Sequence, residues 1–378
     1  MTGKRKTILL TMAVFALEPL PFGAWLALIP FVKEQLALNK AQLAIALLGM
    51  PVGVIPSLQV AGWLMTRVGP RRVLAFAFPA QVLVLCLPLL ATGLISLFLA
   101  LVCFGCVVAM LQVGLNVYAG RLEKQHSVTV MSRCHGFWAL GVMVGSLLIS
   151  LMPATPALLA VAYISVPSAV LGIWVALSLE RLKGHEGTFA PARRPLRSLP
   201  PRLALIALCT LAASMTEGAM SDWAAIYLAE RLSAGASHAG IAVSIFAGFL
   251  AAGRFLGDAG KDRLGVVTLA RFALLLATAG LVLLIVPLPL WTSYAGFALV
   301  GLGVSVGFPL GVSAAAGLDD TYEGPNIAIV ATVTMLGFLV GPPLIGTLAE
   351  QFNLRIGLAA LLPGLIVGIV LAKSLKPA

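Results

Sequence analysis

Charge is the property that this sequence has least of. Lys, Arg, Asp and Glu together supply 10% of the 378 residues, whereas a soluble globular domain normally carries about 25%. Hydrophobic residues supply 60%, and no polar stretch is long enough to fold as a separate soluble domain. This composition excludes a soluble globular protein and indicates a chain embedded in lipid.

Apolar runs of about 20 residues, long enough to cross a bilayer as helices, follow one another along the chain. Backbone groups in lipid must pair with each other, which leaves helices or a closed barrel, and these runs are continuously apolar rather than alternating. We therefore expect an all-α membrane protein. Helices are predicted at about 7–32, 41–65, 73–91, 94–119, 128–151, 155–179, 203–229, 237–257, 266–287, 291–316, 325–349 and 354–372.

Cysteine is also scarce. The five residues, Cys86, Cys103, Cys106, Cys134 and Cys209, all fall in or beside apolar runs. Cys103 and Cys106 form a C-x-x-C pair, but no other ligand type lies near them in the sequence. We interpret all five as small packing residues and expect neither a metal nor a cofactor.

The net charge of +11 raises the question of a nucleic-acid partner, and the distribution of the basic residues argues against one. If both termini are cytoplasmic and the spans alternate, Lys33, Lys40, Arg231 and Arg355 lie outside and the other 21 of the 25 Lys and Arg, Arg254 included, lie on the cytoplasmic side. Such a bias follows the positive-inside rule. The sequence predicts a bacterial inner-membrane protein with both termini cytoplasmic and no Lys or Arg at the bilayer midplane.

Most connections between the predicted helices are short, and residues 180–202 form the exception. Six basic residues and four prolines make this segment too polar to insert and too proline-rich for a helix, so we expect a cytoplasmic linker. The predicted domains are a six-helix bundle over 1–179, the linker, and a second six-helix bundle over 203–378.

The two halves carry the same pattern. A shift of 196 residues carries Thr66-Arg67-x-Gly69 onto Asp262-Arg263-x-Gly265, and Gly141-x-x-x-Gly145 onto Gly337-x-x-x-Gly341. Gly105 and Gly301 share this shift, and Trp25 and Trp223 are 198 apart. Repeats of this kind, related by a pseudo-twofold axis, build many secondary transporters around a midplane site.

The repeated loop resembles that of the major facilitator superfamily, approximately Gly-x-x-x-Asp-Arg-x-Gly-Arg-Arg. The matching residues are Gly62, Arg67, Gly69, Arg71 and Arg72 in the first copy, and Gly253, Arg254, Gly257, Asp258, Asp262, Arg263 and Gly265 in the second. The resemblance implies twelve helices, alternating access, and gating by Arg67, Gly69, Arg72, Asp258, Asp262, Arg263 and Gly265. Thr66 replaces the usual Asp, so the second copy is expected to be the better-equipped latch.

A narrower resemblance is to fucose-permease-like and rhizopine-transport-type bacterial members. It rests on Trp25-x-x-x-Ile29-Pro30, on Asn116 with Glu123, on His135-Gly136 and on the segment Glu217–Trp223. Gln112 and Leu26 stand where the fucose carriers place acidic residues, so fucose and its proton site are not carried over.

Glu18 lies near the middle of the first predicted span. An ionised side chain there costs at least about 2.5–3.5 kcal/mol, so Glu18 should face a cavity or be protonated, which makes it a candidate proton carrier. Pro19 and Pro21 remove backbone donors, and we expect a kink at this point. Thr11 and Trp25 share the face of Glu18; the alternative role for Glu18 is a structural hydrogen bond.

The seventh predicted span repeats this pattern. Thr210, Ser214, Glu217 and Ser221 form one polar stripe, and Asp222 points about 140° away from Glu217. We expect Glu18, Glu217 and Asp222 to couple protons. Substrate-binding candidates are Trp25, Gln112, Asn116, Ser214, Ser221 and Trp223, with polar helix–helix contacts, membrane-interface anchoring of the tryptophans, and a structural contact by Asp222 as the alternatives.

These residues predict a monomeric, proton-coupled transporter of a small polar organic solute, sugar- or polyol-like, with a central cavity lined by spans 1, 4, 7 and 10. Two carboxylates without a midplane Lys or Arg argue against an organic anion. Drug or cationic-metabolite efflux by antiport and a non-transporting receptor stay open as alternatives. An enzyme is not expected, because no clustered nucleophile and base is visible.

Overall fold

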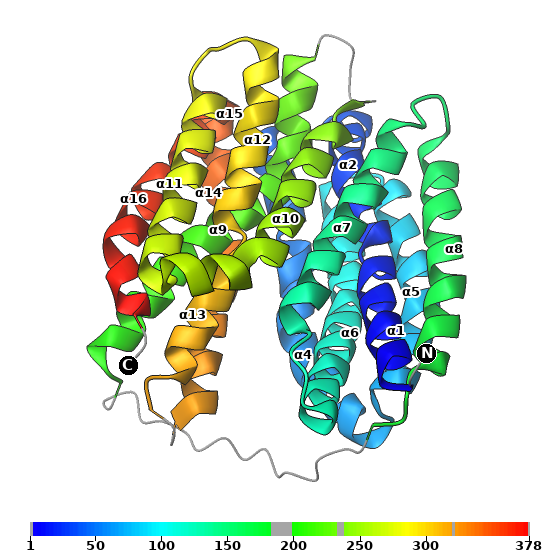
Figure 1. The fold of residues 1–378 in the computed structure, drawn as a ribbon. Coiled ribbons are helices and arrows are strands. Elements are labelled where there is room, and N and C mark those ends of the chain that lie inside the picture. Colours follow the sequence, from blue (N-terminus) through cyan, green and yellow to red (C-terminus); the bar gives the residue numbers. More distant parts are fainter. Residues whose placement is uncertain (1–2, 183–198, 233–237, 320–321, 377–378) are drawn as a thin grey trace. The chain divides into compact units, whose positions relative to one another are not determined.

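A computed structural model describes residues 3–182, 199–232, 238–319 and 322–376. These residues form helices and no strand, and twelve helical stretches are long and apolar enough to cross a membrane, which confirms the predicted number. Figure 1 shows their succession. The helices are α1 (Gly3–Leu17), α2 (Leu20–Gln35), α3 (Lys40–Leu47), α4 (Gly49–Arg67), α5 (Pro70–Leu89), α6 (Leu94–His126), α7 (Met131–Ser150), α8 (Ala157–Ser178), α9 (Pro201–Arg231), α10 (Gly240–Leu264), α11 (Val266–Ile285), α12 (Leu290–Val304), α13 (Gly307–Ala316), α14 (Glu323–Gln351), α15 (Leu354–Ala359), α16 (Leu362–Leu371) and the 3₁₀ helix η4 (Ala372–Leu375).

The first span is interrupted where the prolines predicted a kink. Helix α1 ends at Leu17 and α2 begins at Leu20, with Glu18 and Pro19 between them. Pro21 has no N–H to donate to the carbonyl of Leu17, and the Ser168 hydroxyl of α8 donates to that oxygen instead, at 2.6 Å. The prolines thus open the helix beside Glu18, and a neighbouring helix satisfies the exposed carbonyl.

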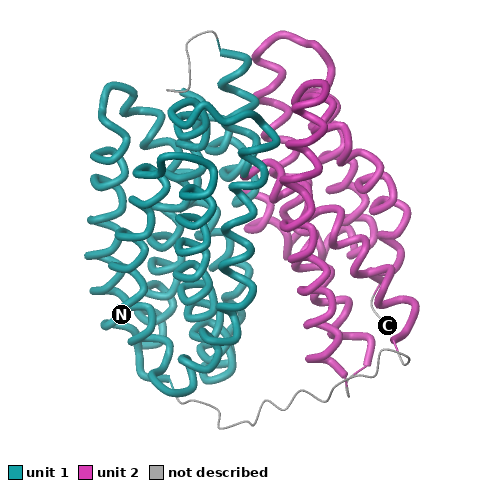
Figure 2. Tube along the Cα trace, turned by 180° about the vertical axis from the view of Figure 1, so that it is seen from behind, with its two compact units in different colours: residues 1–185, 222–251 teal, residues 186–221, 252–378 magenta. Residues whose placement is uncertain are grey.

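The chain divides into two compact units (Figure 2). Unit 1 comprises Met1–His185 and Asp222–Ala251, and unit 2 comprises Glu186–Ser221 and Ala252–Ala378. The division passes through α9 and α10, so these units differ from the predicted six-helix bundles, whose boundaries stay a prediction. Of the predicted linker, residues 183–198 lie outside the described part of the chain.

Glycines bring the helices of unit 1 into backbone contact. A Cβ at Gly141 or Gly145 of α7 would collide with the carbonyl oxygen of Ala16 or Leu20, and one at Gly23 of α2 would collide with that of Val142. Such close approach favours van der Waals packing, which must stabilise helix association in lipid. The Gly141-x-x-x-Gly145 motif therefore fixes α7 on both sides of Glu18.

The same motif packs more loosely in unit 2. Gly337 of α14 lies against Leu211 and Met215 of α9, and a Cβ at this position would lie 2.8 Å from a Leu211 methyl carbon. At Gly341 the nearest atom would be Met215 Cγ at 3.6 Å, an ordinary van der Waals contact. The repeat therefore preserves which helices pair, α7 with the first span and α14 with the seventh, and changes how closely they approach.

The repeat also recurs in the backbone of two turns. Gly69 precedes α5 with φ +86° and Gly265 precedes α11 with φ +76°. Only glycine adopts this left-handed region readily, which explains why both copies of the loop place glycine here.

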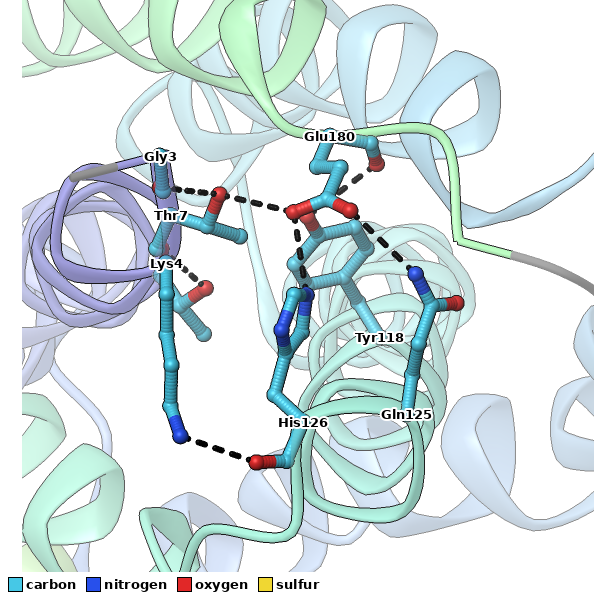
Figure 3. A network of polar contacts seen from close by, with 8 residues as sticks. Gly3, Lys4, Thr7, Tyr118, Gln125, His126 and Glu180 are labelled. Atoms are coloured by element: carbon cyan, nitrogen blue, oxygen red, sulfur yellow. Dashed lines mark hydrogen bonds and ion pairs between the residues drawn. The ribbon is translucent and has the colours of Figure 1, made fainter.

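The end of α8 is held by a polar network around Glu180 (Figure 3). Its carboxylate accepts hydrogen bonds from Thr7 at 3.0 Å and Gln125 at 3.2 Å, and His126 Nε2 lies 3.1 Å from Oε2. The Tyr118 hydroxyl donates to the Glu180 backbone carbonyl at 3.1 Å. The network joins α1, α6 and the segment that follows α8 within unit 1.

Candidate functional site

The Glu18 site lies in unit 1, midway along the first span. The Glu18 side chain is buried, with 1% of the residue exposed, and its Oε2 accepts a hydrogen bond from the Trp138 indole N–H at 2.8 Å. The Gln81 side-chain amide donates to the Glu18 backbone carbonyl at 3.1 Å. Among the described residues no cationic side chain pairs with Glu18, and the neutral Trp138 N–H is the hydrogen-bond donor to its carboxyl group.

Helix α7 supplies Trp138 because of its glycines. Trp138 precedes Gly141 by three residues, which places both on the same helical face, and Gly141 touches the backbone of Ala16. The Phe22 ring lies 6.0 Å from Trp138 and 6.3 Å from Phe104, centroid to centroid. Aromatic side chains therefore line the position of Trp138, the hydrogen-bond donor to the Glu18 carboxyl group.

Unit 2 contains a different acidic site. Arg254 Nη2 donates to Glu217 Oε1 at 2.8 Å, and the two side chains are 10% and 15% exposed. Glu217 lies near the middle of α9 and Arg254 near the middle of α10. Glu217 therefore forms an ion pair with Arg254, whereas the sequence predicted a Glu217 carboxylate without a cationic partner.

Arg254 lies ten residues before the end of α10, whereas the sequence predicted a position three residues before the end of its helix. The charged residues after position 257 indicated a loop, but α10 continues to Leu264, which moves Arg254 from the helix end to its interior. The contact of Arg254 with Glu217, near the middle of α9, argues against the prediction of no Lys or Arg at the bilayer midplane. The argument against an anionic solute therefore loses its basis.

The two tryptophans predicted to contact substrate are both buried in unit 1. Trp25 is 2% and Trp223 0% exposed, which does not fit side chains anchored at the membrane interface. The Trp223 indole N–H has no hydrogen-bond partner within the described part of the chain. Gln112 is half-buried and Asn116 exposed on α6, and Asp222 is half-buried on α9.

The polar stripe of α9 is divided by its packing. Thr210 and Ser214 are buried, and Gly311 of α13 lies against the Thr210 hydroxyl. Ser221 is half-buried, and its hydroxyl donates to the Glu217 carbonyl at 3.0 Å. Unit 2 therefore holds Ser214, Glu217 and Ser221, whereas Glu18, Trp25, Gln112, Asn116, Asp222 and Trp223 belong to unit 1.

The predicted gating residues lie at the ends of α4 and α10 and at the two turns. The Arg67 guanidinium lies 5.4 Å from the Trp63 ring centroid, a cation–π geometry. Arg72 is exposed at the start of α5, and Asp258, Asp262 and Arg263 are exposed at the end of α10. The structure shows no ion pair for Asp258, Asp262 or Arg263 among the residues it describes, so the gating latch stays a prediction.

Sequence reasoning missed a second set of contacts in unit 1. The Ser146 and Ser244 hydroxyl oxygens lie 2.8 Å apart, joining α7 to α10, and Lys40 Nζ lies 2.9 Å from Glu230 Oε1. Gly240 lies against Ala27 and Ser150. Small residues at positions 146, 150, 240 and 244, spaced four apart, were the available signal for this close helix contact.

Comparison with known proteins gives one consistent family. The model of the Major Facilitator Superfamily matches residues 7–318 and again 206–378. Membrane protein MosC of Rhizobium meliloti is 28% identical over 375 residues, covering 98% of this chain and 89% of MosC. Transporter y4wD of Sinorhizobium fredii (strain NBRC 101917 / NGR234), an uncharacterized protein, is 30% identical over 377 residues, covering 96% and 97%.

Solved structures show the same fold. The nucleoside transporter NupG superposes with a TM-score of 0.71 at 14% identity, covering 99% of this chain and 98% of NupG. A bacterial homolog of the human lysosomal transporter Spinster, in an inward-facing and occupied conformation, gives 0.69 at 16% identity, covering 97% and 95%. At these identities the likeness concerns the fold.

Proposed function

This chain belongs to the Major Facilitator Superfamily, a family of multi-pass membrane transporters, and on that premise we propose that it is a proton-coupled secondary transporter. The cargo is a small polar organic solute of the sugar or polyol class, moved by alternating access of the two predicted halves. The chain lies in the bacterial inner membrane with both termini cytoplasmic and works as a monomer.

The observation that carries the proton coupling is the position of Glu18. A carboxyl group buried at mid-span, with an indole N–H as hydrogen-bond donor and no cation paired to it among the described residues, can lose its charge by taking up a proton. Neutral and ionised forms differ in free energy by several kcal/mol in such surroundings. Protonation of Glu18 can therefore decide which conformation is favoured.

The remaining residues are assigned by their position. Glu217 and Asp222 are the further proton-coupling groups, and Gln112, Asn116, Ser214 and Ser221 offer hydrogen bonds to hydroxyl groups. Trp25 and Trp223 give an apolar surface, and the unsatisfied Trp223 N–H is a donor that a bound hydroxyl could satisfy. Arg67, Gly69, Arg72, Asp258, Asp262, Arg263 and Gly265 gate the cytoplasmic side.

Proteoliposomes containing the purified protein test this proposal. Three hexose-derived probes are used: glucitol, which is neutral, glucosamine, a cation, and gluconate, an anion. We expect at least one to accumulate against its gradient when the inside is made alkaline, and to equilibrate without accumulating when the pH gradient is dissipated.

Each contrary outcome identifies a different error. Binding of a probe without flux would indicate the receptor alternative. Glucosamine moving outward in exchange for protons, with no flux of the other two probes, would indicate cation antiport. Flux of a probe that the pH gradient leaves unchanged would remove proton coupling.

A further inference from the structure

We propose that Arg254 binds an anionic group of the cargo, and that Glu217 accepts a proton as it yields its place on the guanidinium to that anion. The substrate class thereby narrows from a neutral sugar or polyol to one that bears a carboxylate or a comparable negative charge. This inference rests on the proposed function and names its substrate class more closely.

The permanent charge of Arg254 is the first argument. An arginine keeps its proton under all conditions that proteins meet, so a positive charge stays in the middle of α10 throughout the transport cycle. An uncompensated charge at that depth costs several kcal/mol. Some anion must accompany Arg254 in every state, and the chain supplies Glu217 at 2.8 Å in this one.

The charge balance of the exchange is the second argument. With Glu217 ionised and no cargo, the pair is neutral. With Glu217 protonated and an anionic group on Arg254, the site is neutral again. If the anionic cargo bound without the proton, the site would carry one excess negative charge. If Glu217 took up the proton without cargo, the site would carry one excess positive charge. The site therefore favours binding of the cargo and the proton together. The only covalent change is the transfer of one proton: an O–H bond of a hydronium ion in the solvent breaks, and an O–H bond forms on a Glu217 carboxylate oxygen.

The packing of α13 adds a second source of positive potential. Gly307, the first residue of α13, lies against Ala213, and Gly311, one turn later, lies against Thr210. Helix α13 therefore runs along α9 with its N-terminus at the end nearer Glu217, which follows Ala213 by one turn on the same face. This N-terminus has no side-chain cap, and its dipole favours a negative charge at the level of the pair.

Few other ionisable groups face the pair. Helix α13 has none, and α14, whose Phe338 ring lies against Gly218, has only Glu323 and Glu350 at its two ends. The break between α12 and α13, at Ser305 and Val306, packs on Gly253 and Gly257 with uncharged side chains.

On α9 and α10 themselves, the nearest acidic residues in sequence are Asp222, half-buried, and Asp258, exposed. Because most neighbours are uncharged, proton uptake that follows the loss of the ion pair can be assigned to Glu217 by substitution.

The affinity of the purified full-length protein for the three probes tests the inference. Thermal stabilisation by glucitol, glucosamine and gluconate is measured between pH 5 and 8 in detergent. We expect gluconate to stabilise most, with an affinity that rises about tenfold for each unit of decreasing pH, because one proton is bound with each anion. In weakly buffered solution, addition of gluconate should raise the pH.

Three variants separate a binding role from a structural one. Glu217→Gln should bind gluconate with the pH dependence and the proton uptake both lost. Arg254→Lys should bind more weakly, because an ammonium group cannot pair with a carboxylate through two parallel N–H groups as a guanidinium can. The double variant Arg254→Gln/Glu217→Gln, which keeps the site neutral and so protects folding, should lose gluconate binding at least tenfold.

The outcomes distinguish this inference from the function on which it rests. Stabilisation by glucitol or glucosamine but not by gluconate overturns the anion site and leaves the transporter proposal standing. Undiminished gluconate binding by the double variant also overturns the anion site. If none of the three probes stabilises the protein, the sugar or polyol class fails and the inference fails with it.

Discussion

Two mid-membrane carboxyl groups in the two halves of this chain have opposite surroundings. Glu18 in unit 1 accepts a hydrogen bond from an indole, whereas Glu217 in unit 2 forms an ion pair with Arg254. The repeat explains part of the difference: a shift of 196 residues carries Leu58 onto Arg254, so unit 1 has no cation at the matching position. Duplicated scaffolds can thus place an acidic group near the middle of a span in each unit and give the two groups different chemistry.

The largest predicted difference between the halves concerns their glycine motifs. Gly145→Ala forces a methyl group onto the Leu20 carbonyl oxygen, whereas Gly341→Ala places it 3.6 Å from a flexible methionine. We expect Gly145→Ala to lose about 3 kcal/mol or more of stability and Gly341→Ala less than about 1. Thermal unfolding followed by size-exclusion chromatography measures both; equal shifts would contradict the difference in packing.

The ion pair gives the next largest effect. Arg254→Gln leaves the Glu217 carboxylate without its cation, and we expect a loss of about 3 kcal/mol. The double variant Arg254→Gln/Glu217→Gln should recover most of that loss. The same melting assay checks this. If the double variant is less stable than both Arg254→Gln and Glu217→Gln, the loss of stability does not come from the unpaired charge of Glu217.

Unit 1 should respond far less to loss of its acidic charge. Glu18→Gln keeps an oxygen that accepts from the Trp138 N–H, so we expect a change below about 1 kcal/mol, while Trp138→Phe removes the donor and should cost about 1–3 kcal/mol. Comparison of the two melting temperatures checks the order. Glu18→Gln proving the more damaging change would indicate a cationic partner for Glu18.

The smallest effect concerns the repeat counterpart of Trp138. A shift of 196 residues carries Trp138 onto Thr334, which is buried and whose hydroxyl has no hydrogen-bond partner in the described part of the chain. Thr334→Val removes that hydroxyl at nearly constant volume, and we expect stability to stay level or rise by about 1 kcal/mol. A loss above about 1 kcal/mol would show that the hydroxyl has a partner in the membrane.

Local signals made the fold predictable. Span length and continuous apolarity identified twelve helices, Pro19 and Pro21 marked the break beside Glu18, and Gly69 and Gly265 marked matching turns. Each of these depends on a few neighbouring residues.

The partners of the acidic residues could not be predicted in the same way. Pairing of Glu217 with Arg254 required knowing that α10 continues to Leu264 through a charged segment. The contact of Glu18 with Trp138 required knowing that α7 packs on the first span. The Gly141-x-x-x-Gly145 motif indicated a close helix contact but not which helix it meets.

The most direct test of the account is the effect of Glu18→Gln on coupled and uncoupled transport of whichever probe the wild-type protein accumulates. We predict that the variant, compared with wild type in the same proteoliposomes, still exchanges labelled for unlabelled probe at a comparable rate but no longer accumulates it under an imposed pH gradient. Full accumulation by Glu18→Gln would contradict the assignment of Glu18 as a proton carrier.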